Sequence, residues 1–157
     1  MWVKHVYIPM QREYRIKRGL SERQIKKHLE SVGWKVYRGG FLHCLRTEMY
    51  PAVETKYKEL ERLMEGEVLE KLQYMCEVQH GMPDFLCYRG YFKFVECKLG
   101  HEQLSDRQKR CISRLMGMGF EVEIYKLVYA CTKNRIAYVN LFDGSKYVKE
   151  RQLRLRI

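Results

Sequence analysis

Residues 84–98 read DFLCYRGYFKFVECK, and this stretch decides the fold. Two runs of β-forming residues surround Arg89-Gly90, which predicts a hairpin of strands 84–88 and 91–98. Side chains alternate along a strand, so Glu96 and Lys98 are expected on one face of the second strand. An acid and an amine inside such an apolar strand are costly to bury unless they have partners or a metal ion. The hairpin is therefore a candidate functional site.

The loop of this hairpin determines what lies beside Glu96. A turn of two residues sets Asp84 opposite Val95, on the wrong face of the sheet. A loop of three residues, with Gly90 in the left-handed region, sets Asp84 opposite Glu96 instead. In that case the two carboxylates could share one divalent cation.

Phosphodiester hydrolysis is the chemistry that this arrangement favours. Carboxylate oxygens, a backbone carbonyl and waters are the ligands that suit Mg²⁺ or Mn²⁺. Such an ion polarises a phosphoryl oxygen and lowers the pKa of water, and Lys98 could orient the attacking water or stabilise developing charge. The same three residues also fit an Asp at a turn and an ordinary cross-strand Glu–Lys pair.

Turn residues and apolar periodicity predict the elements around the hairpin. Ser21 with Gln24, and Ser105 with Gln108, are spaced as capping boxes at two helix starts, with a Leu20–Ile25 staple at the first. The predicted elements are strands at 3–8, 34–37, 120–127, 135–142 and 152–157, and helices at 21–32, 52–75 (one helix, or two broken near Gly66) and 105–118. This order indicates a mixed α/β sandwich.

Charge is distributed unevenly along the 157 residues, whose net charge is +11. Residues 1–38 hold ten Lys or Arg against three Glu, and residues 145–157 hold five against one. Basic ends around a neutral middle suit a polyanion, although a well-solvated surface explains them equally well. The stretch 48–77 holds eight Glu against four Lys or Arg. It is therefore expected to pack or to form a dimer arm rather than to face DNA.

Cysteine spacing and hydropathy exclude several classes of protein. The six cysteines include no C-x-x-C pair, so we expect buried, reduced thiols rather than a structural zinc or a disulfide framework. No apolar run approaches the ~18 residues of a membrane span, and the N-terminus lacks the layout of a secretory signal. A cytoplasmic protein, of a prokaryote or a virus-infected cell, is expected.

Four segments together resemble a known nuclease superfamily. They are GMPDF at 81–85, FVECK at 94–98, LSDRQ at 104–108 and GFEV at 119–122. In this order they are similar to the PD-(D/E)XK superfamily, above all to its virus-type replication–repair (VRR-NUC) branch, which is related to Holliday-junction resolvases. Residues 22–38 resemble the first helix and strand of that branch.

The resemblance implies a restriction-endonuclease-like core, with a central mixed β-sheet flanked by helices, in a single nuclease domain over 1–157 with a helical insertion at about 50–76. It implies a Mg²⁺- or Mn²⁺-dependent enzyme in which Asp84, Glu96 and the Cys97 carbonyl bind metal and Lys98 is catalytic. A family glutamate that completes the metal site maps onto Glu22, and a family glutamine maps onto Gln108. The helix dipole alone also favours an acid at Glu22, and capping alone explains Gln108.

The expected substrate is double-stranded or branched DNA, cleaved in repair or recombination, and a viral protein is among the expectations. Some of the cations after the catalytic strand should face the DNA backbone. The candidates are Arg107, Lys109, Arg110 and Arg114, with Arg38 and Lys26 from the basic N-terminal segment. Many nucleases of the superfamily are dimers, so the resemblance also suits a homodimer. A non-catalytic DNA-binding module and an RNA-processing nuclease are the alternatives.

Overall fold

The hairpin predicted from the sequence is present over residues 85–99. The computed structural model describes residues 1–11, 19–39, 51–78, 80–129 and 133–147. In it β3 (Phe85–Tyr88) pairs with β4 (Phe92–Leu99), with Phe85 opposite Val95 and Tyr88 opposite Phe92. Three residues close the loop, and Gly90 has a φ of 75°. The three-residue loop is therefore confirmed, and its register, continued by one residue, sets Asp84 level with Glu96.

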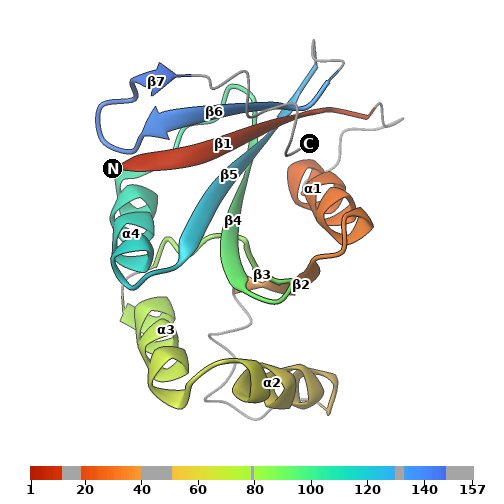
Figure 1. Ribbon diagram of the computed structural model, residues 1–157, viewed down its shortest axis with the longest axis vertical. Helices are drawn as coiled ribbons and strands as arrows, with labels where there is room; N and C mark the ends of the chain where they lie inside the picture. The colour runs from red at the N-terminus through yellow and green to blue at the C-terminus, as the bar shows by residue number, and fades with distance from the viewer. Residues whose placement is uncertain (12–18, 40–50, 79, 130–132, 148–157) are drawn as a thin grey trace.

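The hairpin belongs to a seven-stranded mixed sheet of order β2-β3-β4-β5-β1-β6-β7 (Figure 1). The remaining strands are β1 (Trp2–Pro9), β2 (Lys35–Arg38), β5 (Glu121–Val128), β6 (Arg135–Asn140) and β7 (Lys146–Tyr147). β4, β5 and β1 run parallel, and every other pairing is antiparallel. This sheet confirms the α/β class and is consistent with a restriction-endonuclease-like core.

Helices cover the two faces of the sheet and define two cores. α1 (Leu20–Ser31) packs its buried Ile25 and Leu29 on one face, in the same cluster as Val95 and Cys97. On the other face, α3 (Gly66–Val78) and α4 (Asp106–Gly117) share a cluster with Phe94. Alternation along β4 therefore turns Glu96 and Lys98 toward the α4 face.

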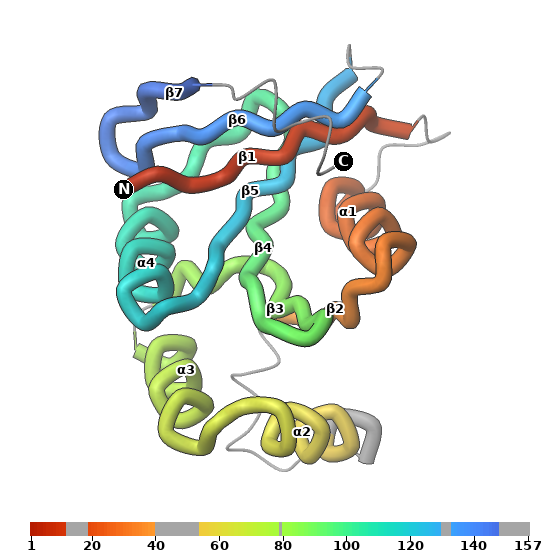
Figure 2. The backbone as a smooth tube through the Cα atoms, in the orientation of Figure 1, coloured from red at the N-terminus to blue at the C-terminus, as the bar shows by residue number. Residues whose placement is uncertain are grey.

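The acidic stretch forms two helices rather than one. α2 (Pro51–Leu63) ends shortly before Gly66, where α3 begins, and Figure 2 traces the pair across one end of the molecule. Leu60, Leu69 and Leu72 are buried in the core shared with α4. The packing role expected of this stretch is confirmed.

The predicted start of α1 is wrong. Gly19, at a φ of 83°, is the N-cap and makes no side-chain cap, so Ser21 already lies inside the helix. The Gln24 side chain bonds the backbone N and O of Gln11 instead, at 3.0 and 2.9 Å, and so ties α1 to the end of β1. Because the left-handed Gly19 is the N-cap, Ser21 and Gln24 form no capping box. Leu20 then lies inside the helix rather than before its N-cap, so the predicted Leu20–Ile25 staple does not form.

Other expectations meet the structure only in part. Cys76, Cys87, Cys97 and Cys111 are free and buried, as expected, whereas Cys44, Cys131 and the strand expected at 152–157 lie outside the described residues. Over the described part of the chain, no helix combines the length and the apolarity that crossing a membrane requires.

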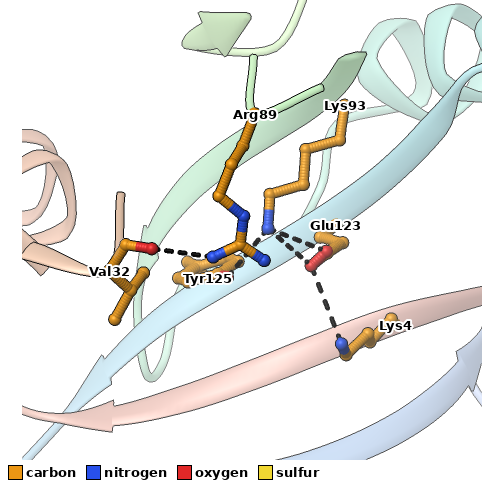
Figure 3. Close-up of polar contacts among 6 residues, drawn as sticks. All are labelled: Lys4, Val32, Arg89, Lys93, Glu123 and Tyr125. Atoms are coloured by element: carbon orange, nitrogen blue, oxygen red, sulfur yellow. Dashed lines mark hydrogen bonds and ion pairs between the residues drawn. The ribbon is translucent and has the colours of Figure 1, made fainter. Parts of the chain in front are cut away.

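An ion pair is buried on the α1 face of the sheet (Figure 3). Lys93 Nζ lies 3.1 and 3.2 Å from the two carboxylate oxygens of Glu123 and 3.2 Å from the Tyr125 hydroxyl. Lys4 reaches the same carboxylate at 3.8 Å, and the Lys93 amine lies 4.0 Å from the centre of the Trp34 ring. These side chains line an open groove of about 800 Å³. Their charges are satisfied within the fold, on the face away from Glu96.

Candidate active site

Glu96 is the centre of a polar cluster on the α4 face. Gln108 on α4 donates from Nε2 to Glu96 Oε1 at 3.0 Å, and Lys98 Nζ lies 3.8 Å from the same oxygen. Asp84, just before β3, accepts the Cys97 N–H at 2.8 Å through Oδ2. The structure thus brings together four of the residues predicted from sequence: Asp84, Glu96, Lys98 and Gln108.

Two close backbone contacts hold Asp84 in place. The Gly39 N–H at the end of β2 donates to the Asp84 carbonyl at 2.6 Å. Gly81, at a φ of 86°, packs so tightly on α4 that a Cβ there would lie 2.9 Å from the Arg107 carbonyl oxygen. A glycine is therefore required at position 81, both by its positive φ and by this close approach to α4. Together these contacts fix the position of Asp84 between β2 and α4.

The two carboxyl groups of the site are in direct contact. Glu96 is only 4% exposed. Burial, followed by the adjacent Asp84 carboxylate, raises the pKa of Glu96 to about 9, against the opposing effect of Lys98. Asp84 also donates its backbone N–H to Glu96, which favours the charged form. Two acids held this close inside a fold are unfavourable alone and become favourable when a cation neutralises them.

The donor chemistry of this pair fits a hard divalent cation. Asp84 and Glu96 offer carboxylate oxygens in one place, which suits Mg²⁺ or Mn²⁺. The Cys97 side chain belongs to the core on the α1 face, where burial raises the pKa of its thiol. Any contribution of Cys97 to a metal would therefore come from its backbone carbonyl.

Glu22 lies near this pair without completing it. Partial burial raises the pKa of Glu22, as does the Asp84 carboxylate, while Arg38 lowers it. Its carboxylate therefore lies within electrostatic reach of Asp84 from the first turn of α1. Among the described residues, however, no group of three or more His, Cys, Asp and Glu is arranged to hold a metal ion. The ligand role of Glu22 stays a prediction.

Gln108 combines both roles that its sequence position allows. Its Oε1 accepts the Ser105 N–H at 2.9 Å, while the Ser105 hydroxyl accepts the Gln108 N–H at 3.2 Å. The predicted capping box of α4 is therefore confirmed. The other end of the same amide reaches Glu96, so capping fixes the orientation in which Nε2 faces the carboxylate.

The cations predicted to bind DNA do not form one surface. Arg107, Arg110 and Arg114 are exposed on α4, where Lys109 is half-buried. Arg38 ends β2 beside Glu22, and Lys26 on α1 lies 3.8 Å from Glu30. α4 and α1, which carries Lys26, lie on opposite sides of the sheet (Figure 1), and Arg38, opposite Phe85 in the pairing of β2 with β3, is on the α1 side. Their contacts with DNA stay predictions.

One cation beside the site was not singled out from the sequence. Lys126 on β5 stands opposite Lys98 in the parallel pairing of β4 with β5. Alternation within strand 120–127 predicts the face on which Lys126 lies. The sequence near Lys126 does not indicate that this strand pairs with β4.

The comparisons with known proteins agree with this geometry. The family model described as the VRR-NUC domain matches residues 17–127, which include all of β2 to β4, α4 and most of β5. No curated protein and no solved structure matches the chain. The matched segment spans more than half of the 157 residues and contains the whole polar cluster. The chain belongs to the VRR-NUC domain family, a family of PD-(D/E)XK-like nuclease domains.

Proposed function

We propose that this protein is a Mg²⁺- or Mn²⁺-dependent deoxyribonuclease. The observation that carries the proposal is the contact between Asp84 and Glu96, with Lys98 and Gln108 on the second carboxylate. A buried acid pair of this kind needs a cation, and an amine directly beside it suits the negative charge that develops at a phosphate under attack.

Each residue has a distinct role in this proposal. A divalent ion between Asp84 and Glu96 would supply Lewis-acid polarisation of the phosphate. Gln108 holds the Glu96 carboxylate in the orientation set by the α4 cap. Lys98 orients the attacking water or stabilises the charge on the phosphoryl oxygens. Glu22 adds negative charge on the Asp84 side and supports the metal from α1.

The substrate that we propose is DNA, double-stranded or branched, cut with a preference for structure such as a junction or flap. Basic chain ends favour a polyanion, and the family is one of nuclease domains. We further propose a single nuclease domain over 1–157, with α2 and α3 as the helical insertion. A homodimer would consist of two such domains, and analytical ultracentrifugation would detect it.

Cleavage of a substrate panel tests the proposal. Plasmid, linear duplex, single-stranded, flap and four-way-junction DNA, with one RNA duplex, are incubated with Mg²⁺, Mn²⁺ or EDTA. We expect cleavage of at least one DNA with metal and none in EDTA, and loss of most activity in Asp84→Ala, Glu96→Ala and Lys98→Ala. Salt-sensitive DNA binding without cleavage under any condition would instead identify a non-catalytic module, and cleavage of RNA alone would make it a ribonuclease.

A further inference from the structure

A row of three cations and one tyrosine crosses four strands beside the candidate active site. Lys98 on β4 stands opposite Lys126 on β5, Lys126 opposite Tyr7 on β1, and Tyr7 opposite Arg135 on β6. These strands lie side by side in Figure 1. We call Lys98, Lys126, Tyr7 and Arg135 the cationic row.

All four members point to the α4 face of the sheet. Lys98 alternates in step with Phe94 and Glu96, and Lys126 in step with Val122 and Ile124, which belong to the core on that face. Tyr7 is in step with Val3 of the same core, and Arg135 is out of step with Ile136, which belongs to the core on the α1 face. The row therefore lies on the same face as Glu96 and crosses β4 two residues further along, at Lys98.

Lys146 on β7 extends the positive charge of the row. Burial lowers the pKa of Lys126, and Lys146 and Lys98 lower it further. Lys146 stands opposite Val139, which is in step with Arg135 along β6, so Lys146 belongs to the same face, and it also lowers the pKa of His5. The Lys126 amine thus lies within electrostatic reach of one amine on β4 and another on β7.

Among the described residues, no acidic side chain neutralises the cations that surround Lys126. In the part of the chain that the structure describes, Lys126, Arg135 and Lys146 make no ion pair, and the carboxylate beside Lys98 is Glu96 of the site itself. Glu123, the nearest acid on β5, lies on the opposite face with Lys93. Like charges fixed on neighbouring strands raise the free energy of the fold, and an anion lying along them would lower it.

The dimensions of the row select the kind of anion. Neighbouring strands lie ~4.8 Å apart, so the three steps from Lys98 to Arg135 cover ~14 Å. A DNA strand carries one phosphate charge per ~3.4 Å of helix axis, so the row is about four times that axial spacing and reaches beyond a single phosphate. A single phosphate or sulfate would meet one or two of these groups, whereas a linear polyanion meets all of them.

We propose that Lys126, Tyr7, Arg135 and Lys146 form a binding track for the backbone of the DNA strand that leaves the Asp84–Glu96 site. The proposal rests on the proposed function, because Lys98 links the row to the scissile phosphate. The amines and the guanidinium pair with successive phosphates, and the Tyr7 hydroxyl donates to a phosphate oxygen between them. Binding along this track sets the direction of the strand through the active site.

The test measures DNA affinity in EDTA, so that it does not depend on cleavage. The double variant Lys126→Gln/Arg135→Gln is compared with the matched control Lys56→Gln/Lys71→Gln, which removes the same charge from exposed positions on α2 and α3. Fluorescence anisotropy with a labelled duplex gives Kd at several salt concentrations. We expect the row variant to weaken binding about tenfold and to reduce the salt slope by about 2, and the control to change neither. Equal effects of both doubles would show a response to net charge only and would overturn the proposal.

A footprint on the unaltered protein covers the case in which the row variant does not fold. Lysines are acetylated with an amine-reactive ester in the presence and absence of duplex DNA and are quantified by mass spectrometry. DNA should protect Lys126 and Lys146 several-fold and leave Lys56 and Lys71 as reactive as before. Unchanged reactivity of Lys126 on saturation with DNA would refute the track. If DNA protects Lys126 in a protein that cleaves none of the substrates, the binding track is supported and the proposed nuclease activity is refuted.

Discussion

Gln108 donates to Glu96 at 3.0 Å with one end of its amide and caps its own helix at Ser105 with the other. The cap and the site are therefore one structural unit. Because Oε1 is fixed by the Ser105 N–H, the amide cannot flip without losing both bonds, so Nε2 always faces the buried carboxylate. A helix start that stabilises the fold here also orients a candidate metal ligand.

The two roles of Gln108 can be separated by substitution. Gln108→Glu keeps an oxygen to accept the Ser105 N–H, but it loses the N–H₂ donor to Glu96. We expect cleavage to fall at least tenfold while the capping box survives. Ser105→Ala should do the reverse, because it removes the side-chain cap, at a cost of about 1 kcal/mol, and leaves the Gln108 donor in place. Rates of DNA cleavage and urea midpoints, measured on both variants, check this expectation.

Gln108→Ala completes that series as its control. It removes both bonds and should lose turnover and stability together. If Gln108→Glu cleaves DNA as fast as the unaltered protein, the amide serves the helix alone and has no part in the site.

Metal binding should be visible as a change in stability. An ion that binds only the folded state stabilises it by about 2.7 kcal/mol at one hundred times its Kd. Mg²⁺ or Mn²⁺ should therefore raise the melting temperature of the unaltered protein and leave that of Glu96→Gln unchanged. In EDTA, Glu96→Gln should melt at the higher temperature of the two, because it removes an acid from close contact with Asp84. Differential scanning calorimetry measures both effects, and equal metal shifts in the two proteins would place the metal elsewhere.

The local part of this site could be predicted from the sequence. The period of two along β4 gave the common face of Glu96 and Lys98, and Gly90 supplied the left-handed residue that a three-residue loop needs. The Ser105–Gln108 spacing marked the start of α4 correctly. All of these features depend on residues within a few positions of one another.

Two features could not be predicted because distant segments decide them. The same Ser-x-x-Gln spacing failed at Ser21, where Gly19 begins the helix and Gln24 bonds Gln11 of the segment after β1. The pairing of β1 with β5 joins the N-terminus to a strand more than a hundred residues later in the chain. Nothing local to Lys126 indicates that Tyr7 will stand beside it.

The buried Lys93–Glu123 pair should matter for stability and not for cleavage. Glu123→Gln leaves the Lys93 amine buried without its counter-charge, which costs about 3–5 kcal/mol for a pair of this kind. The double variant Lys93→Met/Glu123→Leu removes both charges and should recover most of that loss. Urea unfolding measures the two free energies. A single variant as stable as the unaltered protein would mean that water already solvates the Lys93 amine.

His5 should make the fold less stable in mild acid. Burial, followed by the charges of Lys126 and Lys146, lowers the pKa of His5 to about 4, and its buried Nδ1 has no hydrogen-bond partner among the described residues. In the unfolded chain the pKa returns to its ordinary value of about 6.5. Between these two values the unfolded state binds the proton and the folded state does not, so the free energy of unfolding falls as the pH falls from about 6.5 to 4. The two pKa values correspond to a loss of about 3 kcal/mol at the acidic end of that window.

His5→Phe isolates this contribution, because it keeps a planar ring beside Tyr7 and removes the titrating group. Urea unfolding at half-unit steps between pH 4 and 7 should show a clearly shallower slope for the variant than for the unaltered protein. Carboxylates contribute to both curves alike, so the difference between them reports His5. Parallel curves would show that His5 is already protonated, or solvated, in the folded state. The positive charges of Lys126 and Lys146 would then have to lie farther from His5 than they do in the structure.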